Sequence, residues 1–157
     1  MFVADAMLKK LARWLRILGA EAIYPEDESD NAILALAKEK NAVLLTQDVE
    51  LSERAKKGKL RVFLVPRDIT TLQQIALLVK EFELNVEDFP SKTLCPKCNG
   101  RLAVAGRKDV EGKVPEGILK RFEAYWLCGS CGKAYWEGSH WLKIKKEVEE
   151  LGKLISP

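Results

Sequence analysis

The chain has 157 residues, of which 47% are hydrophobic and 31% are charged, and its formal net charge is +3. This length and apolar content suffice for one medium domain or two small ones with a hydrophobic core. The composition excludes a low-complexity chain, the apolar runs are too short to cross a membrane, and the modest positive charge permits nucleic-acid binding without demonstrating it.

The first 90 residues alternate short apolar runs with helical patterns. Strands are predicted at residues 2–4, 22–24, 42–46 and 60–65. Between and after them, apolar residues recur at helical spacing, which predicts helices over 8–19, from Ser29 or Asp30, from Asp48 to Gly58, and from Thr70 or Thr71 to about Phe82. The alternating order predicts an α/β fold with a parallel sheet and helices on both faces.

The rest of the chain has a different character. Residues 85–93, which include Pro90, have the composition of a linker. Short β-like pieces then alternate with two cysteine pairs, and a lysine-rich helix is predicted over 137–154. We therefore expect an α/β domain over 1–88 and a smaller zinc-ribbon domain with a C-terminal helix over 89–157.

All four cysteines lie in two C-x-x-C pairs, Cys95 with Cys98 and Cys128 with Cys131. Two such pairs can place four thiolates at the corners of a tetrahedron, the ligand set of a structural zinc site. The alternatives are two disulfides or one redox pair, but no cysteine is left over, and Asn99-Gly100 and Gly132 suit the positive φ of a zinc knuckle. Such a site has no open position, so the chemistry must lie elsewhere. Zinc-held thiols agree with a reducing compartment, and we expect a cytoplasmic protein.

Acidic residues follow the predicted strands. Asp5 ends the first strand, Asp30 opens the helix after the second, and Asp48 lies just past the third. Because ligands bind beyond the carboxyl ends of parallel strands, these carboxylates could share a Mg²⁺ or Mn²⁺ ion. Alternatively, Asp30 and Asp48 are helix N-caps, a role that is less obvious for Asp5. Asp68, past the fourth strand, is a possible fourth acid.

The helix after Asp5 has a basic side. Lys9, Lys10, Arg13 and Arg16 fall largely opposite its leucines. Basic residues along one side of a helix usually mean only that this side is exposed to solvent. Here the basic side begins beside the predicted metal site, where an RNA backbone would need neutralising, so Lys9, Arg13 and Arg16 are candidate phosphate contacts.

Several motifs together resemble the Mut-seven C-terminal RNase domain, a PIN-like family. They are Phe2-Val3-Ala4-Asp5, Leu11-Ala12-Arg13-Trp14-Leu15-Arg16-Ile17-Leu18-Gly19, Leu45-Thr46-Gln47-Asp48 and Tyr135-Trp136-Glu137-Gly138-Ser139-His140-Trp141. The resemblance implies a PIN-like α/β domain fused to a zinc ribbon, with Mg- or Mn-dependent ribonuclease activity. It also implies that Asp5, Asp30 and Asp48 are the first three catalytic acids and that Thr46 is the hydroxyl residue orienting the third.

The expected function is therefore that of a metal-dependent endoribonuclease. The expected substrate is RNA, and the expected cofactors are structural zinc and catalytic Mg²⁺ or Mn²⁺. One alternative is a non-catalytic RNA-binding or assembly module, in which the aspartates are caps and the ribbon makes the contacts. Another is a toxin-like nuclease that is inhibited by a protein partner.

Overall fold

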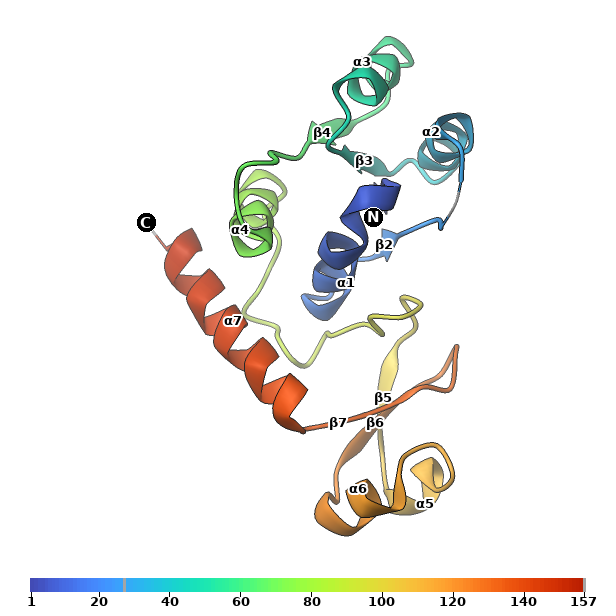
Figure 1. Cartoon of the computed structure of the whole chain (residues 1–157), viewed down its shortest axis with the longest axis vertical. Helices are drawn as coiled ribbons and strands as arrows, with labels where there is room; N and C mark the ends of the chain where they lie inside the picture. Colours follow the sequence, from blue (N-terminus) through green and yellow to red (C-terminus); the bar gives the residue numbers. More distant parts are fainter. Residues whose placement is uncertain (27, 157) are drawn as a thin grey trace.

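The protein is described by a computed structural model, which covers residues 1–26 and 28–156. An α/β part lies at one end and a smaller β part at the other, and a long C-terminal helix runs from the β part back to the α/β part (Figure 1). The predicted fold class is confirmed.

The α/β part is built on a four-stranded parallel sheet. Its strands are β1 (Phe2–Ala4), β2 (Ala22–Ile23), β3 (Val43–Thr46) and β4 (Val62–Leu64). They lie side by side in the order β2-β1-β3-β4, with β1 paired to β3 and β3 to β4. Since all four strands run the same way, their carboxyl ends meet at one edge of the sheet. All residues of β1 and β3 are buried, as expected for central strands covered on both faces.

Helices follow each strand at the predicted places. They are the short 3-10 helix η1 (Ala6–Leu8), α1 (Lys9–Ile17), α2 (Asp30–Glu39), α3 (Val49–Lys57) and α4 (Thr71–Glu81). Side-chain caps fix their starts: Ser29 accepts from the amide of Ala32, and Thr70 forms a capping box with Gln73. The two starts that the sequence left open are thus resolved in favour of Ser29 and Thr70.

Each face of the sheet buries its own hydrophobic core. On one face, Ala4 and Leu45 pack with Leu11 and Leu15 of α1 and with Leu78 of α4. On the other face, the core is formed by residues of β1, β3, α2 and α3, namely Val3, Leu44, Ile33, Ala37, Leu51 and Ala55. Because adjacent strand residues alternate between these cores, the sheet is held rigidly and its carboxyl edge is a fixed platform.

The β part is a three-stranded antiparallel sheet that carries both cysteine pairs. Its strands are β5 (Leu102–Ala105), β6 (Tyr125–Cys128) and β7 (Ala134–Trp136), in the order β5-β6-β7. Two short helices, α5 (Arg107–Val110) and α6 (Glu116–Arg121), lie between β5 and β6. The sequence predicted only β-like pieces there, because helices of four and six residues are too short for a helical period to show.

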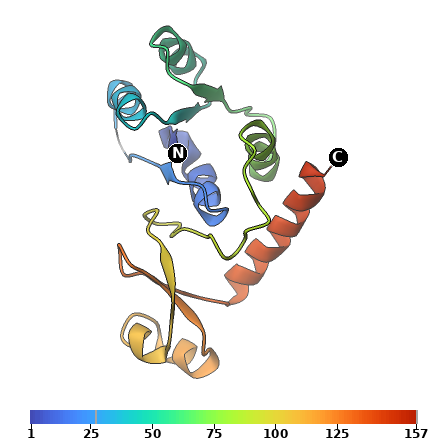
Figure 2. The ribbon, with the colours of Figure 1, turned by 180° about the vertical axis from the view of Figure 1, so that it is seen from behind.

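The C-terminal helix α7 (Ser139–Ile155) confirms the predicted helix. It packs against α4, as both views show, and it buries Ile144 and Leu151 in the core of the α/β part (Figures 1 and 2). At its start, Trp141 stacks with Trp126 of β6 at 5.9 Å between ring centroids. Although α7 falls within the predicted second domain, over 89–157, it is therefore shared between the two parts.

Pro157 lies outside the described residues. None of the helices within the described ranges is long and apolar enough to span a bilayer.

Candidate functional site

Two of the predicted acids meet at the carboxyl edge of the sheet. Asp5 directly follows β1, and its amide donates to the carbonyl of Leu45 at 2.9 Å, which continues the pairing of β1 with β3. Asp48 lies two residues past the end of β3. The side chain of Asp5 is largely buried, and that of Asp48 is half-buried. We call Asp5, Thr46 and Asp48 the acidic edge.

Thr46 connects the two acids. Its fully buried hydroxyl donates to Oδ2 of Asp5 at 2.8 Å, and it accepts from the backbone amide of Asp48 at 3.0 Å. The hydroxyl therefore orients the carboxylate of Asp5 directly and positions Asp48 through its backbone. The resemblance implied that Thr46 orients the third acid, and its hydroxyl contacts both the backbone amide of that acid, Asp48, and the carboxylate of the first, Asp5.

Both acids also cap helices. Oδ1 of Asp48 accepts from the amide of Leu51 at 3.1 Å, and Oδ1 of Asp5 accepts from the amide of Ala6 at the start of η1. Asp5 thus has a structural role that the sequence did not suggest. A carboxylate offers about four lone-pair sites, so capping leaves both residues able to bind a cation.

The remaining predicted acid, Asp30, makes its contact elsewhere. Asp30 is the first residue of α2, and its Oδ2 forms an ion pair with Nη1 of Arg54 on α3 at 2.9 Å. Among the described residues, the only group of three or more acidic, histidine or cysteine side chains whose ligand atoms lie within 4.8 Å of one another is the set of four cysteines. In this arrangement Asp30 therefore does not share a coordination sphere with Asp5 and Asp48.

The basic side of α1 divides into exposed and buried residues. Lys9 is exposed, forms an ion pair with Glu26, and lies over the ring of Tyr24. Arg13 is exposed as predicted. Arg16, by contrast, is only 7% exposed, because the cysteine-bearing part covers that side of the helix. The prediction that Arg16 contacts phosphate is corrected by this burial.

Arg16 instead joins the two parts of the molecule. Its guanidinium donates to the carbonyls of Ala22, Pro96 and Lys97 at 2.8, 2.8 and 3.0 Å. The side chain of Asn99 completes the junction, because it accepts from the amide of Ala22 at 3.0 Å and donates to its carbonyl at 2.8 Å. The first cysteine loop therefore caps the edge strand β2 much as another strand would.

The four cysteines are arranged to hold a metal ion such as zinc. All are free thiols, and the Sγ atoms of Cys95 and Cys131 are 3.7 Å apart while those of Cys98 and Cys128 are 3.5 Å apart. A tetrahedron with metal–sulfur bonds of about 2.3 Å has sulfur–sulfur edges of about 3.8 Å, so the site fits zinc, and these distances exclude the two disulfides.

The loops around the thiols are adapted to this site. Asn99 and Gly132 have positive φ, as predicted. A Cβ on Gly100 would lie 2.5 Å from Sγ of Cys128, so only glycine fits there. Burial raises the pKa of the Cys98 thiol to about 12. Burial also raises that of Cys128, but hydrogen bonds from the amides of Cys131 and Ser130 outweigh it and lower the pKa to about 7.

Tyr135 provides a further contact to the cysteine cluster. Its hydroxyl lies 3.0 Å from Sγ of Cys95. Burial, followed by this hydrogen bond, raises the pKa of Tyr135 above its usual range. With zinc bound, the hydroxyl would donate to the Cys95 thiolate, which is how an outer residue orients a metal-bound thiolate.

Two arginines near the acids were not singled out from the sequence. Arg54 holds Asp30, and Arg67 bonds to the carbonyl of Gln47, the residue between Thr46 and Asp48. No local pattern links Arg54 to Asp30, which is 24 positions away, or Arg67 to Gln47, which is 20 positions away. Their roles follow from packing of α2, α3 and β4.

Comparison with known proteins identifies the chain at the level of a family. No curated protein and no solved structure matched it. The family model described as Mut7-C RNAse domain matches residues 1–148. This confirms the resemblance found from the motifs and indicates a nuclease-like function with RNA as substrate. Because the match spans nearly the whole chain, the chain belongs to the Mut7-C RNAse domain family.

Proposed function

We propose that the protein is a metal-dependent endoribonuclease whose reaction takes place at the acidic edge. The observation that carries this proposal is the placement of Asp5 and Asp48 side by side at the carboxyl edge, coupled through the buried hydroxyl of Thr46. The hydrogen bond from the buried Thr46 hydroxyl holds the Asp5 carboxylate in one orientation, and such preorganisation suits a metal ligand.

The proposed catalytic cofactor is Mg²⁺ or Mn²⁺. Carboxylate oxygens are the ligands that these ions prefer, and the bound ion would activate a water and stabilise charge on the scissile phosphate. Asp5 and Asp48 would hold the ion, with Thr46 keeping Asp5 in place. Asp30 would complete the set after its ion pair with Arg54 opens, a change that costs little because both side chains are substantially exposed.

Other residues would bind and support the substrate. Lys9 and Arg13 are exposed on α1, the helix that follows Asp5 and η1, and would neutralise the RNA backbone. Cys95, Cys98, Cys128 and Cys131 would hold structural zinc, which keeps the β part folded and docked on α1. Reduced, clustered thiols support a cytoplasmic location.

The alternative is a non-catalytic RNA-binding or assembly module. It is favoured by the capping roles of Asp5 and Asp48 and by the ion pair of Asp30, which give all three acids a structural purpose. The two functions differ in their need for a divalent ion, since catalysis requires it and binding through the β part does not.

The deciding experiment is cleavage of single-stranded and structured RNAs with Mn²⁺ or with chelator. We expect Mn²⁺-dependent internal cleavage that Asp5→Asn abolishes, because the substitution keeps the shape but removes charge at the metal. Asp109→Asn is the matched control: its carboxylate accepts from the amide of Gly106, in the β part, so it also caps a helix. RNA binding without cleavage by the parent, or undiminished cleavage by Asp5→Asn, would favour the binding module.

A further inference from the structure

Arg67 is fixed beside the acidic edge by contacts between two loops. It follows β4, whose end pairs with the end of β3. Its Nε and Nη2 both donate to the carbonyl of Gln47, at 3.0 and 2.7 Å. In return, the side chain of Gln47 donates to the carbonyl of Pro66 at 3.3 Å. Since Gln47 stands between Thr46 and Asp48, the guanidinium is held at the rim of the acidic edge.

This geometry leaves half of the guanidinium free. The planar group has five N–H donors in a rigid fork, and the carbonyl of Gln47 uses the Nε–Nη2 side. Across the described ranges, 1–26 and 28–156, Arg67 forms no other hydrogen bond or ion pair, and the residue is exposed. The remaining Nη1 and Nη2 donors match two oxygens of one phosphate, the bidentate pairing that arginine makes best.

A positive charge beside the acidic edge would help RNA to bind there. Asp5 and Asp48 put two carboxylates at the edge, and they would repel an RNA strand that approached without compensation. Lys9 and Arg13 lie on α1, which packs against β1 and β2, whereas Arg67 follows β4. Since β3 separates β1 from β4, Arg67 follows a strand end that lies two strand spacings, about 10 Å, from the end of β1 that carries Asp5.

We propose that Arg67 forms a phosphate-binding subsite for the RNA strand, next to the phosphate that is cleaved. A strand lying across the strand ends would place one phosphate at Asp5 and Asp48 and a neighbouring phosphate on Arg67. The two hydrogen bonds to the carbonyl of Gln47 already hold the Arg67 side chain away from both acids. Little conformational entropy of this side chain is therefore lost when it binds a phosphate. This proposal rests on the proposed ribonuclease function, because it assigns the substrate's path through that site.

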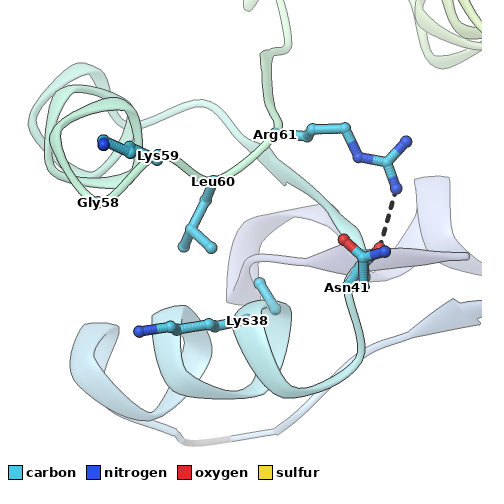
Figure 3. A pocket seen from close by; sticks show the side chains of 8 residues that line it. Lys38, Asn41, Gly58, Lys59, Leu60 and Arg61 are labelled. Atoms are coloured by element: carbon cyan, nitrogen blue, oxygen red, sulfur yellow. Dashed lines mark hydrogen bonds between the residues drawn. The ribbon is translucent and has the colours of Figure 1, made fainter.

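Arg61 supplies a matched control at the other end of the sheet. It precedes β4, is exposed, and donates from Nη2 to the carbonyl of Asn41 at 2.9 Å, so it also ties two loops through a backbone carbonyl (Figure 3). It lines a cleft of about 450 Å³ together with Lys38 and Lys59. This cleft lies at the amino ends of β3 and β4, away from the acidic edge.

The experiment measures binding of a single-stranded RNA by the zinc-loaded protein without added Mg²⁺ or Mn²⁺, over a range of salt concentrations, for Arg67→Ala, Arg67→Lys and Arg61→Ala. We expect Arg67→Ala to weaken binding about tenfold at low salt for all RNA sequences. The salt slope, which is the slope of log affinity against log salt concentration, should become shallower by about one. Arg67→Lys should restore the slope but only part of the affinity, because an ammonium cannot bind in the same bidentate way. Arg61→Ala should match the parent.

An unchanged affinity and salt slope in Arg67→Ala would overturn the subsite, and so would an equal loss in Arg61→Ala. If Arg67 only tied the loops together, its variant would lower the melting temperature without changing the salt slope. Because binding is measured without added Mg²⁺ or Mn²⁺, the result does not depend on catalysis. A parent that fails to cleave RNA with Mn²⁺ would refute the ribonuclease function while this measurement still decides the role of Arg67.

Discussion

Replacing Arg16 tests how the cysteine-bearing part is joined to the α/β part. Arg16→Ala removes a charged, buried side chain that donates to three backbone carbonyls, those of Ala22, Pro96 and Lys97. The two hydrogen bonds to Pro96 and Lys97 cross the junction, and the third ties α1 to β2.

The expected loss can be worked from these contacts. A hydrogen bond to a charged group contributes about 1.5–3 kcal/mol, and its removal leaves buried carbonyls without a donor. Because the three bonds share one side chain, they are not additive, and we expect a total loss of about 4 kcal/mol in the free energy of unfolding. For a chain of this length, that corresponds to a fall of about 8–16 °C in melting temperature.

Thermal unfolding of the zinc-loaded protein, followed by circular dichroism, measures this loss. Arg13→Ala is the control, because Arg13 is one turn earlier on the same helix but exposed, and its replacement should change stability by less than about 0.5 kcal/mol. Arg16→Lys keeps the charge but not the fork of donors, so it should fall between the two. Equal melting temperatures for Arg16→Ala and Arg13→Ala would refute the bridging role.

Three further predictions concern the metal sites. Arg54→Ala should free Asp30 and raise the Mn²⁺ affinity of the acidic edge several-fold by calorimetry; unchanged affinity would mean that Asp30 is not a ligand. Removing zinc with a chelator should speed hydrogen exchange of the Ala22 amide, because the loop carrying its acceptor loosens; equal exchange would contradict the coupling. Gly100→Ala should lose zinc on dialysis, since the added Cβ would clash with a ligand sulfur, whereas Gly117→Ala, with open space around it, should retain a full equivalent by elemental analysis.

The strand and helix order could be read from the sequence because each element is encoded locally. Buried strands such as β3 are apolar except at their ends, and caps such as Asp48 are recognisable beside the helices that they start. The four-cysteine cluster was predictable for a similar reason. The C-x-x-C spacing sets the geometry of each pair, and only the joining of the two pairs needed the fold.

The burial of Arg16 shows where such reasoning fails. Helical spacing correctly separated the leucine side of α1 from its basic side, but it could not tell that another part of the chain covers the end of that side. The partners of Arg16, Pro96 and Lys97, are 80 and 81 positions away. The partner of Asp30 is on another helix, and it draws a predicted metal ligand away from the acidic edge.

The sequence by itself determined where most strands and the long helices lie, which residues start those helices, and which side chains could bind metal. These are properties of short segments, set by side-chain periodicity and by backbone geometry within a few residues. Only the tertiary structure decided which polar groups meet: Thr46 with Asp5, Arg54 with Asp30, and Arg67 with Gln47. The hydrogen-bond partners of long polar side chains depend on how segments distant in the sequence pack together. No local pattern specifies which acceptor a buried donor will meet.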